Sequence, residues 1–174
     1  MQDTANTLFL DSPVPEGDLA MGVFIAYEDI AAGKRAKETC NFLAESLGVN
    51  WILDTQVASF TALRIPRLRY FAAEEAAKAN ILFISCNDGK LPSGVNEWLQ
   101  LCLARCGGPM ALVALFSCPR LGATHAIAAE TYLAAKAKQA RMQFFSGFDS
   151  APGQSQRRGP SASALGPLGK RISL

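Results

Sequence analysis

Short apolar runs alternate along this chain with longer segments of helical periodicity, and this alternation is the feature that most constrains its fold. The apolar runs lie at residues 22–27, 49–54, 81–85, 110–116 and 143–147. Runs of this length are typical of strands, whereas the segments between them carry apolar residues every three or four positions, as amphipathic helices do. Strands that alternate with helices predict a parallel sheet with right-handed crossovers and helices on both faces.

The number of strand and helix units makes this prediction more specific. Five strands and four helices within residues 21–149 suit one three-layer, doubly wound α/β domain. Its five-stranded parallel sheet is expected to have the flavodoxin-like order 2-1-3-4-5. Residues 55–66 show no clear period, so they are expected to form either a lid over the site or a packed loop.

The two ends of the chain differ from its middle in composition. Residues 1–20 contain four acidic residues and no Lys or Arg, whereas residues 150–174 contain four basic residues and no acid. Both segments are punctuated by Pro and Gly, and neither has the apolar content that a core requires. We therefore predict a flexible acidic arm at residues 1–20 and a disordered basic tail at residues 150–174.

Composition also limits the class of function. The longest uninterrupted apolar run has seven residues, at 110–116, whereas a membrane-spanning helix needs about 20. The formal net charge is only +2, and the first residues lack the basic start and apolar core of a signal peptide. We expect a cytoplasmic protein with reduced cysteines that binds neither nucleic acid nor membrane.

Acidic residues come directly after the first apolar run. Glu28 and Asp29 stand where the first strand should end, and Asp88 and Ser117 follow the third and fourth strands. Ligands of doubly wound sheets bind beyond the carboxyl ends of the strands. Two adjacent carboxylates repel unless a cation relieves them, and Mg²⁺ prefers oxygen ligands. The alternative is structural: Asp29 caps the following helix, and Asp88 belongs to an Asn-Asp-Gly turn.

Other chemistries lack their sequence signatures. Neither GxxxxGK[ST] nor GxGxxG occurs, so nucleotide binding through those loops is unsupported. Cys102 and Cys106 have helical spacing and, with Cys86 and Cys118, offer a metal-binding alternative, but packing as small buried hydrophobes explains them better. His125 is the one histidine, and nothing specific pairs it with a cysteine nucleophile.

Three arginines, Arg64, Arg67 and Arg69, form a small basic patch in the sequence. A nucleic-acid interface is usually denser in basic residues and interleaved with aromatic ones. Solvent exposure or attraction to the acidic arm is the expected role of this patch.

The first unit, FIAYED followed by a helix, resembles the start of response-regulator receiver domains, and the resemblance spans residues 22–148. In receivers an acidic pair holds Mg²⁺, an aspartate after the third strand accepts phosphate, and a hydroxyl and a lysine follow the fourth and fifth strands. Glu28 and Asp29 match the acidic pair, and Ser117 matches the hydroxyl. Ser85 stands at the acceptor position, and QFFSGF offers no lysine. The resemblance therefore implies a receiver-like domain that is not phosphorylated.

These expectations define a functional hypothesis and an alternative to it. We expect a non-phosphorylatable, receiver-like regulatory or protein-interaction module with a protein partner, a homodimer being one option. No catalytic residue is expected, and no cofactor apart from weak Mg²⁺ binding at Glu28 and Asp29. The alternative is a small enzyme or ligand-binding protein that uses an acidic crevice at Glu28, Asp29, Ser85, Asp88 and Ser117. The chain also resembles short uncharacterised bacterial α/β proteins, which implies a bacterial source.

Overall fold

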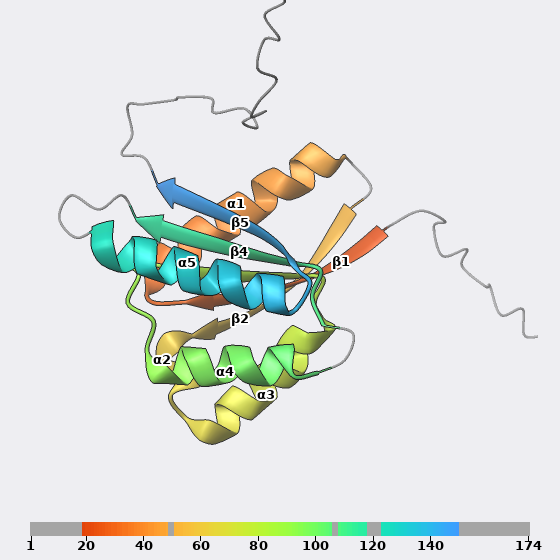
Figure 1. The fold of residues 1–174 in the computed structure, drawn as a ribbon. Helices are drawn as coiled ribbons and strands as arrows, with labels where there is room; N and C mark the ends of the chain where they lie inside the picture. Colours follow the sequence, from red (N-terminus) through yellow and green to blue (C-terminus); the bar gives the residue numbers. More distant parts are fainter. Residues whose placement is uncertain (1–18, 49–50, 106–107, 118–122, 150–174) are drawn as a thin grey trace, which may run out of the picture.

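In the part of the chain that the structure describes, five parallel strands form one sheet (Figure 1). The computed structural model describes residues 19–48, 51–105, 108–117 and 123–149, so most of the arm and all of the tail expected from the sequence lie outside it. The strand order is β2-β1-β3-β4-β5, which confirms the predicted order. The strands are β1 (Leu19–Tyr27), β2 (Trp51–Ser59), β3 (Ile81–Cys86), β4 (Ala111–Ser117) and β5 (Gln143–Asp149).

Helices cover both faces of the sheet, as the alternation of strands and helices predicts. They are α1 (Ile30–Leu47), α2 (Phe60–Leu63), α3 (Pro66–Lys78), α4 (Ser93–Leu103) and α5 (Ala123–Gln139). On one face α1 packs its Ala36 and Cys40 against Val23 and Ile25 of β1. The other four helices share the opposite face (Figure 1). None of the helices in the described ranges is long and apolar enough to cross a membrane.

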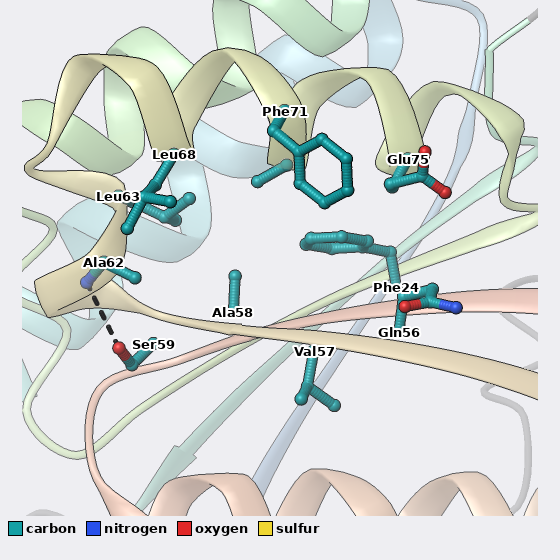
Figure 2. Close-up of a pocket in the computed structure, with 11 residues that line it drawn as sticks. Phe24, Gln56, Val57, Ala58, Ser59, Ala62, Leu63, Leu68, Phe71 and Glu75 are labelled. Carbon is teal, nitrogen blue, oxygen red and sulfur yellow. Dashed lines mark hydrogen bonds between the residues drawn. The ribbon is translucent and has the colours of Figure 1, made fainter.

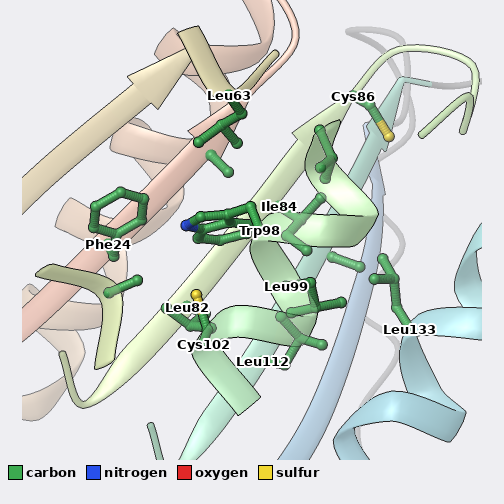
Figure 3. Packing of buried hydrophobic residues seen from close by; sticks show 14 of the residues in the cluster. Phe24, Leu63, Leu82, Ile84, Cys86, Trp98, Leu99, Cys102, Leu112 and Leu133 are labelled. Carbon is green, nitrogen blue, oxygen red and sulfur yellow. The ribbon is translucent and has the colours of Figure 1, made fainter. Parts of the chain in front are cut away.

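The larger core lies between the sheet and the helices α2 to α5. Trp98 of α4 is fully buried at its centre and stacks on Phe24 of β1, with ring centroids 5.5 Å apart (Figure 3). Leu82 and Ile84 of β3 and Leu133 of α5 pack in the same cluster. Burial of this apolar surface is the main favourable term that holds the helices on the sheet.

The second strand is longer than the sequence indicated. We expected it to end at Asp54, but β2 continues to Ser59 because its whole length pairs with β1, from Leu19 opposite Trp51 to Tyr27 opposite Ser59. The short helix α2 follows at once, and the Ser59 hydroxyl accepts a hydrogen bond from the Ala62 amide at 3.2 Å. Residues 55–66 are therefore mostly strand and helix.

Asn80, the residue before β3, is hydrogen-bonded to β1 and to the residue before β4. The Gly22 amide of β1 donates to Asn80 Oδ1 at 2.8 Å, and the Asn80 amide donates to the Gly22 carbonyl at 2.7 Å. The Asn80 carbonyl accepts from the Met110 amide, just before β4, at 2.8 Å. Asn80 thus helps to fix the register of β1, β3 and β4, in which Tyr27 lies beside Ser85 and Ser85 beside Leu115 near the carboxyl ends of the strands.

Candidate functional site at the carboxyl ends of the strands

Glu28 extends the pairing between β1 and β3 by one residue and turns its carboxylate toward β3. Its amide donates to the Ser85 carbonyl at 3.0 Å. Its Oε2 accepts a hydrogen bond from the Asn87 amide at 2.6 Å. The loop after β3 is therefore attached to the end of β1 through a charge-assisted hydrogen bond, which is shorter and stronger than a neutral one.

Asp29 is the N-cap of α1, which confirms the capping interpretation. Its Oδ1 accepts from the Ala32 amide at 2.8 Å, and its Oδ2 accepts from Asn87 Nδ2 at 2.8 Å. These two bonds lower the pKa of the Asp29 carboxyl below its ordinary value, and the bond from the Ala32 amide has the larger effect. The negative charge also lies at the positive end of the helix dipole.

Arg35 brings a positive charge into the crevice from the second turn of α1. Its Nη1 donates to Ser117 Oγ at 2.8 Å, and its Nη2 donates to the Cys86 carbonyl at 3.0 Å. The same Nη2 lies 3.4 Å from Asn87 Oδ1. One guanidinium therefore spans the ends of β3 and β4, next to the switch point between β1 and β3 where ligands bind in folds of this topology.

Asn87 joins the acidic side of the crevice to the basic side. Its side-chain amide donates to Asp29, and its Oδ1 accepts from the Ser117 hydroxyl at 3.0 Å and from Arg35. Glu28, Asp29, Arg35, Asn87 and Ser117 thus form one continuous set of hydrogen bonds, which we call the polar network. Its charged members are two carboxylates and one guanidinium.

The structure separates the other two predicted site residues from the polar network. The Asp88 carboxylate turns to Lys90, with Oδ2 2.9 Å from Lys90 Nζ and Oδ1 3.1 Å from the Lys90 amide. Ser85 is completely buried in the core, where its hydroxyl has no hydrogen-bond partner among the residues that the structure describes. Within the described ranges no group of three or more His, Cys, Asp or Glu residues is arranged to hold a metal ion.

The described thiols are placed for packing. Cys86 and Cys102 are fully buried, and burial raises the pKa of each thiol to about 12. A cysteine nucleophile requires the opposite shift, because the thiolate is the reactive form. His125 lies exposed on α5. Cys106 and Cys118, the other half of the metal-binding alternative, lie outside the described residues.

Sequence reasoning placed Glu28, Asp29 and Ser117 at this site but missed Arg35 and Asn87. The sequence contains a signal for each of these two residues. Helix side chains lean toward the helix amino end, so a long basic residue in the second turn of α1 can reach back to the strand ends. Asn87 is the first residue after β3, at the edge where ligands bind in such sheets.

Fold and site together define the class of this protein: a doubly wound α/β domain of flavodoxin-like topology with a polar network at the carboxyl ends of β1, β3 and β4. No protein-family model and no curated protein matches the sequence. The geometry of the polar network is therefore what supports a functional proposal.

Proposed function

We propose that this protein is a receiver-like regulatory or protein-interaction module whose crevice is filled by its own Arg35 and does not undergo phosphorylation. It acts through its surface, by binding a protein partner. The observation that carries this proposal is the guanidinium held by the Ser117 hydroxyl and the Cys86 carbonyl at the centre of the crevice.

The hydrogen bonds of the two carboxylates, together with the nearby Arg35 guanidinium, support a crevice that needs no added cation. The two carboxylates already accept hydrogen bonds from the amides of Asn87 and Ala32 and from the Asn87 side chain. The guanidinium is covalently part of the chain, so it reaches this place without the entropy cost that an added ion has on binding. A cation that entered would have to break bonds that folding has already made.

The acceptor side of the crevice also supports the proposal. Phosphotransfer needs an exposed nucleophile next to the bound metal. Ser85, which stands at the acceptor position of receivers, is buried below the network. Asn87, the side chain that does reach the crevice from β3, ends in an amide that donates to Asp29.

The test is a thermal-shift titration of the full chain with Mg²⁺, Mn²⁺ and acetyl phosphate, together with intact mass after exposure to the phosphodonor. A ligand that binds the native state raises the melting temperature by mass action. We expect wild type to show neither a saturable shift nor added mass. Arg35→Ala should remove the positive charge that acts on Asp29 and so gain a saturable Mg²⁺ shift, which Asp29→Asn should remove again.

Lys37→Ala is the matched control. Lys37 is exposed on the same helix, and its substitution removes one positive charge, as Arg35→Ala does. It should behave as wild type does. A partner recovered by crosslinking in cells should bind the purified protein equally with and without Mg²⁺ and phosphodonor. A saturable Mg²⁺ shift in wild type that is lost in Asp29→Asn would contradict the proposal and favour a ligand-binding crevice.

A further inference from the structure

One long edge of the sheet has no strand beside it among the described residues. The strand order leaves β2 paired with β1 on one side only, and β2 is nine residues long. Its residues from Asp54 to Val57 are exposed, as is Ile52, and Ile52 and Val57 are the apolar ones among them. An edge of this length with apolar side chains is a template for another strand, and natural proteins usually cover or shorten such edges.

An apolar cavity opens next to this edge, between β2 and α3 (Figure 2). Its volume is about 210 Å³, and it is lined by Phe24 and Ala58 of the sheet and by Leu68 and Phe71 of α3. Phe71 is 62% exposed and Leu68 is 45% exposed. Large apolar side chains grouped at a cavity beside an open strand edge indicate a surface that something covers.

The other face of the same edge is apolar too. Val57 is among the residues that line the cavity, but its side chain points to the opposite side of β2 from that of Ala58 (Figure 2). Val57 is 59% exposed. A strand added beside β2 would place alternate side chains on the two faces. The edge therefore suits a segment whose consecutive residues are all apolar.

We propose that residues 7–10 of this chain, Thr-Leu-Phe-Leu, pair with the outer edge of β2 as an antiparallel strand. Leu8 and Leu10 would lie on one face of the sheet and Phe9 on the other, so that the cavity and the Val57 side are both covered. This run is the one apolar stretch of the acidic arm that lacks Pro and Gly. The inference rests on the sheet edge and not on the proposed function.

The length of the connection fits this placement. Residues 11–18 join the segment to Leu19, which pairs with Trp51 at the start of β2. To reach the cavity beside Gln56, the path crosses two strand spacings, about 10 Å, and runs about 17 Å along β2, a direct distance of about 20 Å. Eight residues reach up to about 26 Å when extended. The segment must then run opposite to β2, and Pro13 and Pro15, which lack an amide hydrogen, would end the pairing.

Charge supports the antiparallel direction. A segment that runs opposite to β2 carries the residues before it, including Asp3, toward the Ser59 end of β2. There Arg64 and Arg67 are exposed on the turn and first residues of α3. Arg69, the third arginine of the basic patch, is instead buried and donates from Nε to the Leu63 carbonyl at 3.0 Å. The two exposed arginines are thus the ones available to the acidic arm.

The test is hydrogen exchange of the full chain, with the outward-facing amides of β2 as the readout. We expect Leu8→Asp combined with Leu10→Asp to accelerate exchange of these amides at least about tenfold and to leave β3 and β4 unchanged. The matched control is Thr4→Asp combined with Ser12→Asp, which adds the same charge outside the apolar run and should exchange as wild type does.

Two results would overturn the inference. The first is identical β2 exchange in wild type and in the Leu8, Leu10 variant. The second is protection of β2 that disappears on dilution together with a change of oligomeric state by light scattering, because a second copy would then be the occupant. Retained protection at all concentrations in wild type and control, and its loss in the variant, supports the arm.

Discussion

Among single residues, Asp29 carries the clearest pH-dependent interaction of the polar network. Its carboxylate accepts from the Ala32 amide and from Asn87, and these bonds lower its pKa in the folded protein. A group whose pKa is lower in the folded state stabilises that state above its unfolded pKa. This stabilisation is lost as the pH falls through the folded pKa.

We therefore predict that Asp29→Ala lowers the free energy of unfolding by about 1 kcal/mol at neutral pH, the usual worth of an N-cap. The difference from wild type should shrink as the pH falls below the ordinary value of 3.8. Urea unfolding of both proteins at several pH values checks this. Asp29→Asn, which keeps an accepting oxygen, should lose less. A difference that stays constant with pH would contradict the prediction.

The contact between neighbours in the chain was predicted from the sequence, whereas the contacts of Arg35 across the fold were not. Asp29 and Ala32 are three positions apart, and the cap between them follows from local chemistry. Arg35 and Ser117 are 82 positions apart. Their contact depends on the level at which each strand ends, which Asn80 helps to fix at the far edge of the sheet. The resemblance to receivers placed Ser85 in the crevice, but β3 continues to Cys86 and Ser85 is buried.

At the scale of the elements, substitution of three glycines by alanine would show the effect of backbone strain and the effect of steric overlap separately and together. Gly48, after α1, has φ +108 but nothing within 4 Å of an added Cβ. Gly94, in the first turn of α4, has no positive φ, but an added Cβ would lie 2.7 Å from the Leu63 carbonyl oxygen. Gly89, in the turn after β3, has φ +81, and an added Cβ would overlap the Ala126 backbone of α5.

We predict the order of destabilisation from this geometry. Gly48→Ala should lower the free energy of unfolding by about 1 kcal/mol, from backbone strain alone. Gly94→Ala should cost about 1–3 kcal/mol, because α4 must move away from α2. Gly89→Ala combines both effects and should cost most. Urea unfolding of the three variants measures the order, and a Gly48→Ala cost equal to that of Gly89→Ala would refute it.

The extent of β2 shows how pairing overrides local sequence preference. Residues 55–59 have no period that identifies a strand, and β2 reaches Ser59 because β1 offers nine partners in register. By contrast β3 and β4, which are covered on both faces, are continuous apolar runs that sequence inspection found directly. Edge strands are harder to find because half of their side chains face solvent.

For the molecule as a whole, the buried thiols report global unfolding. Cys86 and Cys102 lie in the core, and burial raises their pKa to about 12. Alkylation requires both access and the thiolate. We predict that the native protein leaves both thiols unlabelled even as the pH rises past 9.0, the ordinary thiol value, and that denaturant makes them react.

Alkylation followed by digestion and mass spectrometry resolves each cysteine separately. The denatured protein, treated identically, is the control for reagent activity. Rapid labelling of Cys86 in the native protein would mean that the loop after β3 opens locally. The polar network would then be less stable than the core beneath it.

The sheet order also bears on how the chain assembles while it is being synthesised. β2 pairs with β1, β3 pairs with the other side of β1, β4 pairs with β3, and β5 pairs with β4. Every strand after the first therefore meets a partner that has already left the ribosome. Multi-strand proteins expose unpaired edges during folding, and these are sites of aggregation. Here the strands can join the sheet in the order in which they are translated. Each strand therefore has all of its partners once the next two strands have emerged.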